Sequence, residues 1–472
     1  MSLTTSLAAG SGGESGGDAE ELRDLAQRIV TQACARGASD AECVIRTGRE
    51  FSATVRLGEV ENLKEAGSKS LGIRVFRGSR AASTYTSDFG WPAIEHLINS
   101  ALEIATIASE DPCAGLADAA DLASGEDLEA LAERLALYSP RASTVTTAEG
   151  IELARRCERA ALDVDPRLTN SDGGSFESAE GLKVLVTSRG FAGQYRRSFC
   201  SIAAVPIATQ DGQMQRDYWY AVARDAEGLE SPESVGRKAA ERTLRRLGAR
   251  KVPTARVPVV FDPQVAQSLL DHVYEAANGE SVYRGTSFLH DQLGKPIAAT
   301  RLSVVDDGRR VGGFGSAPFD GEGVATRRTP VIEQGVLANF LLNSYTARKL
   351  QRRTTGNAAR GLAGNPGIGV GNFYIEPGSQ SPQEIIRSIP NGLYVTEFIG
   401  SGVNIVTGDY SRGASGLWIE NGELTYPVEE ITVAGNLKEM LRNIAAVGND
   451  LVFRSSSAAP TLLLEGLTVA GV

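Results

Sequence analysis

Apolar residues recur every three or four positions in several stretches of the chain, as in a helix with one buried face. In residues 19–35, for example, Leu22, Leu25 and Ile29 fall on one side, and Gly37 then supplies a C-terminal stop. The same spacing predicts helices after Asp88 and over residues 147–162, 232–247 and 263–277, and a capping sequence predicts one more from Ser381.

Between these helices, apolar and polar residues alternate, and glycine-containing turns interrupt the alternation. This pattern is typical of strands joined by tight turns. Residues 71–76 and 81–86 flank Gly78 and are predicted to form a hairpin. Asn421-Gly422 lies between two apolar runs and favours a type I′ hairpin turn. Further strands are predicted at residues 42–60, 182–187, 193–205 and 213–222.

The order of these elements predicts an α+β protein with two ordered domains. Helix, strands and helix follow one another twice before Pro253, which indicates an N-terminal domain of helices packed on an antiparallel sheet. After that point short β-rich stretches with glycine turns dominate, and we expect an antiparallel, barrel-like C-terminal domain with a few helices. The predicted boundaries are 1–18 for a disordered leader, 19–250 for the first domain, with related units at about 19–110 and 126–250, and 251–472 for the second.

Charge and composition exclude several classes of function. The chain has 48 Lys and Arg against 58 Asp and Glu, a net charge of −10, so we expect no direct nucleic-acid binding. It contains no run of about 18 apolar residues and no visible signal-peptide pattern, so no membrane association is predicted. Its cysteines form no CxxC pair and fit reduced thiols in a cytoplasmic protein; they are Cys34, Cys43, Cys113, Cys157 and Cys200.

No familiar catalytic motif is visible in the residues themselves. The three histidines, His96, His272 and His290, are widely separated, whereas a zinc-protease helix needs two histidines and a glutamate on neighbouring turns. No nucleophile elbow or phosphate-binding glycine loop is present. The glycine clusters at 312–315 and 361–371 are interpreted as turns and tight packing, and the basic residues of 237–251 as a solvated helix face.

Long stretches of the chain nevertheless resemble one known family. The most specific is the run Gly-Val-Asn-Ile-Val-Thr-Gly-Asp-Tyr-Ser-Arg-Gly-Ala at residues 402–414. Other matching segments are 216–220, 279–294, 318–323, 343–350, 418–423, 426–428, 430–437 and 447–450. Together they resemble the TldD/TldE family, specifically its TldE (PmbA) branch, whose members are also called modulators of DNA gyrase. The similarity extends from about Ala19 to the C-terminus.

This resemblance implies a subunit of a cytoplasmic, heterodimeric metallopeptidase. In the family, the TldD-type subunit carries the zinc ligands on an HExxxH helix and a later cysteine, and the TldE-type subunit pairs with it and lacks them. Such complexes process or degrade unfolded peptides, which enter an enclosed cavity as extended chains. We therefore expect a TldD-type partner that holds the zinc, extended peptides as substrates, no cofactor in this chain, and a homodimer when the chain is alone.

The family motif can be placed on this chain by matching Gly279-Glu280 and the residues after it. The HExxxH positions then fall on residues 270–275, with Leu270 and Glu275 at the histidine positions and Asp271 at the general-base position. No cysteine follows Cys200, so the third ligand is missing as well. A catalytic zinc needs three protein ligands, and the resemblance therefore predicts that this chain has no catalytic residues and no metal site.

Three functional hypotheses remain open from the sequence. The first is a non-catalytic partner subunit that shapes the cavity of a TldD-type peptidase. The second is a self-sufficient peptidase with an unrecognised site that uses Asp271, His272 and Glu275. The third is a non-proteolytic binding protein that modulates DNA gyrase or another client.

Overall fold

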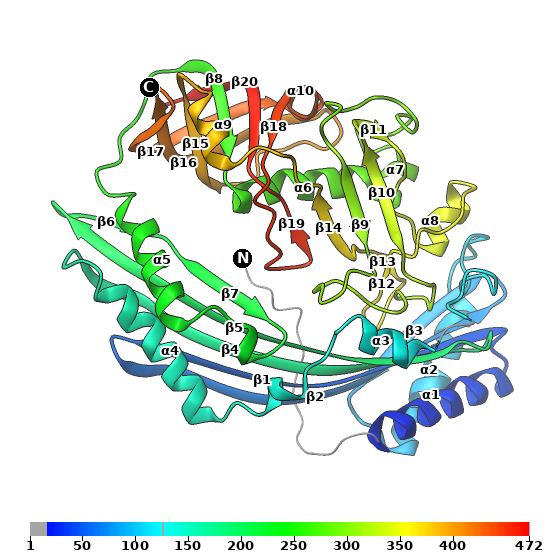
Figure 1. The fold of residues 1–472 in the computed structure, drawn as a ribbon. Helices are drawn as coiled ribbons and strands as arrows, with labels where there is room; N and C mark the ends of the chain where they lie inside the picture. The colour runs from blue at the N-terminus through cyan, green and yellow to red at the C-terminus, as the bar shows by residue number, and fades with distance from the viewer. Residues whose placement is uncertain (1–16, 125–126, 472) are drawn as a thin grey trace.

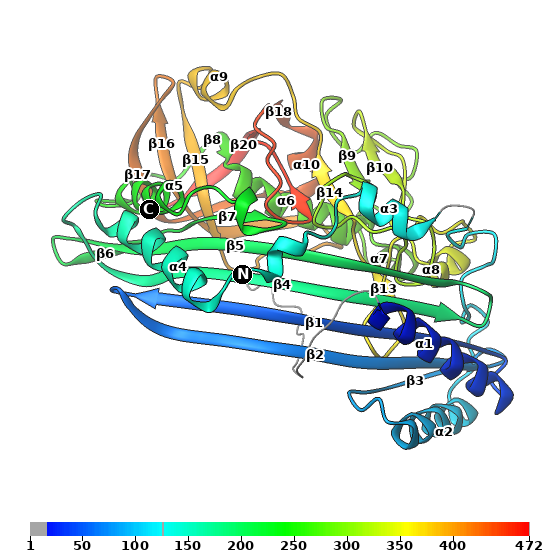
Figure 2. The same ribbon diagram turned by 60° about the horizontal axis from the view of Figure 1, so that its bottom comes forward.

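The computed structural model describes residues 17–124 and 127–471. Within them, strands from the first half of the chain form one long sheet, and strands from the second half form a separate body above it (Figures 1 and 2). The predicted α+β class is confirmed. Residues 1–16 of the predicted leader lie outside the described residues, and residues 17 and 18 begin the first helix, α1 (Gly17–Ala35).

The N-terminal sheet is antiparallel throughout and has seven strands. Its order is β3-β2-β1-β4-β5-β6, and β7 pairs with β5 beside β6. The strands are β1 (Asp40–Arg56), β2 (Glu59–Arg77), β3 (Arg80–Thr86), β4 (Leu168–Thr187), β5 (Ala192–Gln210), β6 (Gln213–Arg216) and β7 (Trp219–Ala223). Because β1 pairs with β4, the strands before and after residue 126 belong to one continuous sheet.

A pair of helices covers each end of this sheet (Figure 2). At one end lie α1 and α2 (Trp91–Ile107); at the other lie α4 (Thr147–Leu162) and α5 (Pro232–Leu244). The short α3 (Leu128–Arg134) and the 3-10 turns at Pro140–Ser143 and Ala226–Gly228 complete this half. The predicted order of helix, strands and helix therefore occurs twice.

The two faces of β1 show how the sheet joins the halves of the protein. Side chains alternate between the faces of a strand. Cys43 and Ile45 pack into the cluster formed by α1 and α2, whereas Val44, between them, packs against Phe319 from the second half of the chain. The sheet is thus buried on both faces at this end.

The second half of the chain is built around a closed barrel. Its five strands run β17-β16-β15-β8-β20, and β17 also pairs with β20, which closes the ring. They are β8 (Ala255–Phe261), β15 (Asn391–Ile399), β16 (Asp409–Glu420), β17 (Glu423–Asn436) and β20 (Leu462–Ala470), with β18 (Ile444–Val447) added beside β20. At the predicted type I′ turn, Asn421 and Gly422 have φ of 53° and 80°. The barrel-like prediction is confirmed, but the barrel is not antiparallel throughout, because β15 pairs with β8 in parallel.

A second sheet lies beside the barrel, with the order β11-β10-β9-β14-β19. Its strands are β9 (Val304–Asp307), β10 (Arg328–Glu333), β11 (Val336–Leu337), β14 (Asn372–Ile375) and β19 (Ser457–Ala458). The hairpin of β12 (Ala358–Ala359) and β13 (Gly367–Ile368) and the helices α7 (Gly279–Tyr283), α8 (Ser344–Lys349), α9 (Pro382–Arg387) and α10 (Leu437–Arg442) fill the remainder. The helix α6 (Pro263–Ala277) extends from the barrel toward this sheet (Figure 1).

The basic residues after Pro232 differ from the sequence-based interpretation. Arg242 is buried, and its guanidinium lies 3.3 Å from the carboxylate of Asp217 on the sheet side and 3.9 Å from that of Asp262 on the barrel side. Arg246 pairs with Glu397 of the barrel at 2.7 Å. This run is therefore only partly a solvated face: Arg237, Lys238, Arg250 and Lys251 are exposed, whereas Arg242 and Arg246 pair with acidic residues of the sheet and the barrel.

Candidate functional site

The helix α6 carries the three positions to which the family resemblance assigns the HExxxH motif. It begins at Pro263, as the sequence predicts, and the structure shows Asp262 as its N-cap, with the Asp262 carboxylate accepting a hydrogen bond from Gln264 N at 3.0 Å. Its apolar stripe includes Val265, Leu269 and Val273, all buried. Whether α6 could hold a metal ion depends on where the side chains of residues 270, 271, 272 and 275 lie.

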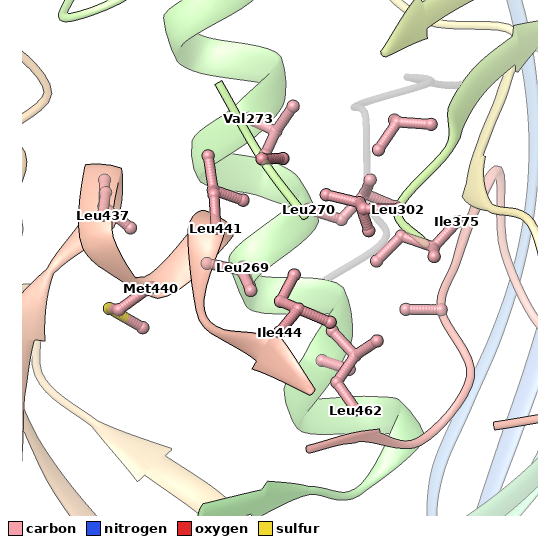
Figure 3. Packing of buried hydrophobic residues seen from close by; sticks show 14 of the residues in the cluster. Leu269, Leu270, Val273, Leu302, Ile375, Leu437, Met440, Leu441, Ile444 and Leu462 are labelled. Atoms are coloured by element: carbon pink, nitrogen blue, oxygen red, sulfur yellow. The ribbon is translucent and has the colours of Figure 1, made fainter. Parts of the chain in front are cut away.

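Leu270, at the first histidine position, points into the apolar core. Its side chain is fully buried among leucine and isoleucine side chains from several elements of the second half (Figure 3). The labelled neighbours in that view include Leu302, Ile375, Ile444 and Leu462. A ligand at this position would face hydrocarbon instead of an open coordination site.

Asp271 and Glu275 lie on the opposite, exposed side of α6. Both carboxyl groups are accessible to solvent, whereas Leu270 is buried. Partial desolvation outweighs the nearby Arg412 and raises the pKa of Asp271 to about 6. The exposed face therefore presents two carboxyl groups, one of which titrates close to neutrality.

His272 lies next to this face but in a more enclosed place. Its ring meets that of Tyr410 of β16 edge to face at 6.0 Å, and its Nε2 is buried without a hydrogen-bond partner. Desolvation, together with the positive charge of Arg412, lowers the pKa of His272 to about 4. The ring is thus neutral at physiological pH and does not share the direction of Leu270.

The segment around β19 lies beside α6. The Gln267 side-chain amide donates to Ser455 Oγ at 3.3 Å, and β19 follows directly. Ala458, in β19, is buried and packs with Val305 and Tyr374 in a cluster separate from that of Leu270. The chain therefore brings this segment to the helix without giving it a metal-binding side chain.

These residues do not fit a zinc ion. Across residues 17–124 and 127–471, no three His, Cys, Asp or Glu side chains are grouped so that they could hold a metal ion. His290 is engaged with the carbonyl of Val282 at 2.8 Å, and His96 is exposed on α2. The five cysteines are free thiols within the first half of the chain. We therefore derive no metal-dependent step for this chain.

A second group of polar residues, which the sequence analysis did not identify, joins the N-terminal sheet to the second half. This charged junction consists of Glu42 on β1, Arg74 on β2, and Asp320, Glu322 and Arg360 from the second half, all buried. Both Arg74 and Arg360 form ion pairs with Glu42. Burial alone would raise the pKa of Glu42, but Arg360 and Arg74 outweigh it and hold that pKa below its usual value.

The two acids of the second half are positioned by backbone groups. Asp320 accepts hydrogen bonds from the backbone N–H groups of Glu322, Val324 and Ala358 at 2.8–3.0 Å, and Glu322 accepts one from Ser344 N at 2.9 Å. Burial and the neighbouring Glu322 raise the pKa of Asp320 to about 7, and burial also raises that of Glu322. A sequence signal for this network existed only in the matched segment 318–323, since its members are distant along the chain.

Comparison with known proteins identifies the family. The PmbA/TldA metallopeptidase C-terminal domain matches residues 254–471, the central domain matches 140–247, and domain 1 matches 41–105. The chain belongs to the PmbA/TldD metallopeptidase family. It is 42% identical to "Metalloprotease PmbA" of Escherichia coli O157:H7 over 96% of this chain and 97% of that protein. It is 38% identical to "Metalloprotease PmbA homolog" of Haemophilus influenzae over 96% of each.

Solved structures agree with this assignment. A Bacteroides thetaiotaomicron protein named as a modulator of DNA gyrase superposes with a TM-score of 0.88 at 29% identity, covering 96% of this chain and 99% of that one. TldE from Thermococcus kodakarensis has the same fold, with a TM-score of 0.81 at 20% identity over 95% of this chain and 100% of its own. Within the described residues of our chain, no helix is both long and apolar enough to span a membrane.

Proposed function

We propose that this chain is the non-catalytic, TldE/PmbA-type subunit of a metallopeptidase complex that processes or degrades extended peptides. The catalytic zinc would belong to a TldD-type partner, and the present chain would complete the cavity in which the peptide is bound. Family membership supports a role in metallopeptidase chemistry. The free thiols agree with a reducing compartment such as the cytoplasm.

The observation that carries this proposal is the environment of Leu270. Leu270 is packed among aliphatic side chains and cannot coordinate a metal, and Glu275 is exposed. Among the described residues, these positions belong to no group of three possible metal ligands, which a catalytic zinc needs. An unpaired imidazole in such a core would cost roughly 1–3 kcal/mol, so the position favours a structural side chain.

The exposed loop between β15 and β16 supports a partner surface next to α6. Ile399, the last residue of β15, and Val406 in the loop are 60% and 52% exposed, although both are large apolar side chains. Phe288 N donates to Ile405 O at 2.8 Å, and Tyr410 at the base of the loop contacts His272. We infer that this loop contributes to an apolar interface, which in an obligate complex buries more than about 2,000 Å². In the isolated chain the same surface would pair with a second copy.

A self-sufficient peptidase is the second candidate, and one observation favours it. Asp271, with a pKa of about 6, lies next to the neutral His272, a combination that general acid–base catalysis can use. Exchange of Asp271 for Asn would then abolish peptide cleavage by the isolated chain. Under the leading proposal the isolated chain has no such activity to lose.

The deciding experiment compares the isolated chain with its complex. We expect the purified chain to bind no stoichiometric zinc and to cleave no unfolded peptide, whereas co-expression with a TldD-type subunit that has an intact HExxxH should give a zinc-containing, active heterodimer. Chelator-sensitive peptidase activity in the isolated chain would refute the non-catalytic role. A stable complex with DNA gyrase, but none with a TldD-type subunit, would favour the non-proteolytic alternative.

The contribution of the loop can be tested in the same experiment. Ile399→Asp combined with Val406→Asp should greatly reduce co-purification with the TldD-type subunit, because the charges oppose an apolar interface. Ile107→Asp is the matched control, since Ile107 is 83% exposed on α2 at one end of the N-terminal sheet. Equal retention of the partner by both variants would remove this loop from the interface.

A further inference from the structure

A basic pocket of about 350 Å³ lies between β10 and the loop that follows α8. Two pairs of consecutive arginines line it, Arg327-Arg328 at the start of β10 and Arg352-Arg353 in the loop. All four side chains are exposed. This concentration of positive charge is unusual in a chain whose net charge is −10.

The backbone presents the second arginine pair from a fixed position. The chain turns after α8 with Gln351 in the left-handed region, at φ 53°, and Arg352 N donates to Ala347 O at 2.8 Å. Thr355 Oγ1 then accepts a hydrogen bond from Leu342 N at 2.7 Å, and Thr354 Oγ1 donates to Leu342 O at 3.1 Å. The loop is therefore held on both sides of the pair.

Only half of the positive charge in the pocket is compensated. Arg328 pairs with Glu376 at 2.6 Å, and Arg353 pairs with Asp121 at 2.5 Å. Among the described residues, Arg327 and Arg352 form no salt bridge and no side-chain hydrogen bond. Two uncompensated guanidinium groups on one cavity repel each other, and an anion between them would remove that repulsion.

The rest of the pocket suits an organic ligand of limited size. Phe340 and Leu342 contribute apolar side chains that are 6% and 2% exposed, and Pro330 lies beside them. Small-molecule sites have volumes of about 300–1,000 Å³ and combine an apolar lining with a few convergent polar groups. This pocket is at the small end of that range.

We propose that this pocket binds a small phosphate-bearing molecule, and that Arg327 and Arg352 hold its phosphate groups. A diphosphate carries more than one negative charge and several oxygen acceptors, so it can satisfy guanidinium groups from two sides of the cavity. A single carboxylate has one charge and would leave one arginine unpaired. The proposal is independent of the peptidase role and concerns a different part of the molecule from the exposed face of α6.

The test is isothermal titration calorimetry of the full-length chain at low ionic strength with inorganic pyrophosphate as the probe. We expect one saturable site, and a loss of affinity of about 10- to 100-fold in either Arg327→Gln or Arg352→Gln, as for the removal of a charge-assisted hydrogen bond. Arg387→Gln, an exposed arginine on α9, is the matched control and should leave the affinity unchanged.

Other probes distinguish the sources of the phosphate. If ADP binds more tightly than pyrophosphate, the ligand is a nucleotide whose organic part uses the apolar wall; if both bind equally, the diphosphate alone is recognised. Citrate that binds as tightly as pyrophosphate would overturn the phosphate assignment. Absence of saturable binding, or equal losses in Arg387→Gln and Arg327→Gln, would overturn the site itself.

Discussion

The core around α6 and the charged junction are both buried, but their chemistry is opposite. Around Leu270 every neighbour labelled in Figure 3 is aliphatic or a methionine, and these residues meet through shape and apolar area alone. At the junction, Glu42, Arg74 and Arg360 meet through ion pairs between the N-terminal sheet and the second half of the chain. One region joins elements of the second half to each other, and the other region joins the two halves.

This difference indicates what each region contributes. Apolar burial stabilises by roughly 25 cal/mol per Å² and tolerates exchange of similar shapes. A buried ion pair adds little net stability, because desolvation opposes attraction, yet loss of one partner leaves an uncompensated charge. We therefore expect substitutions in the α6 core to lower the free energy of unfolding in proportion to the side-chain volume removed. The junction is expected to determine how the N-terminal sheet is positioned against the second half of the chain.

The largest effect is expected when the junction loses its central acid. Glu42→Ala would leave Arg74 and Arg360 buried without their carboxylate, at a cost of about 3–5 kcal/mol in the free energy of unfolding. Urea denaturation measures this value. The control is Glu227→Ala, which removes the partner of Arg141 from a pair that is 63% and 70% exposed and should cost at most about 1 kcal/mol. Equal losses of unfolding free energy in the two variants would show that Glu42 contributes no more to stability in its buried ion pairs than Glu227 does in an exposed pair.

A somewhat smaller effect is expected in the α6 core. Leu270→Ala removes aliphatic carbons from a fully buried position and should cost about 2–5 kcal/mol, depending on how far the site collapses. Leu63→Ala on β2, where the side chain is 49% exposed, is the control and should stay within about 0.5 kcal/mol of the wild type. If Leu270→Ala behaves like this control, Leu270 does not belong to a tightly packed core.

A smaller effect of the junction is expected in the pH dependence of the free energy of unfolding. The pKa of Asp320 in the folded protein is about 7, above its ordinary value of about 4, so the folded state binds more protons than the unfolded state between these pH values. Stability from this group is therefore present at low pH and is lost as pH rises toward 7. Glu322→Gln removes the neighbouring negative charge, lowers the pKa of Asp320 and should flatten this decline.

Unfolding free energies at pH 5 and pH 8 measure the change in slope. Glu227→Gln, at the exposed pair with Arg141, is the control and should follow the wild-type profile. A Glu322→Gln profile as steep as that of the wild type would assign the pH dependence to other groups, such as Asp306, whose pKa burial raises to about 7 as well.

The same two regions explain which features the sequence could predict. The α6 helix was predicted with its observed limits, Pro263–Ala277, because apolar residues recur along it at helical spacing, which is a local signal. The first part of β4 was missed because its glycines resemble turn residues. In the fold, a Cβ on Gly174 would lie 2.3 Å from the carbonyl oxygen of Ala154, so close packing of α4 requires glycine there.

The charged junction could not be predicted for a different reason. Glu42 and Arg360 are separated by most of the chain, and neither position differs locally from an ordinary surface charge. Their burial depends on the pairing of the sheet with the second half, which no local pattern encodes. The proposed absence of the motif histidines, by contrast, rests on the family resemblance, which assigns Leu270 and Glu275 to those positions, and it stays a prediction.

The smallest gain is expected from rebuilding the motif by Leu270→His, Asp271→Glu, Glu275→His and Ala458→Cys. The imidazole at 270 would lie in the aliphatic core, whereas the one at 275 would be exposed. Ala458 packs in a separate cluster with Val305 and Tyr374. Ligating histidines also need partners that orient their second nitrogen, whose loss lowers metal affinity or activity about 10- to 100-fold.

Zinc titration and peptide turnover should therefore show weak binding and background activity in the variant alone, with the Leu270→His single variant as the control for destabilisation. Robust, chelator-sensitive turnover would contradict this expectation. It would mean that α6 can rotate or shift to bring both positions to one metal, and that the apolar core around Leu270 is not rigid.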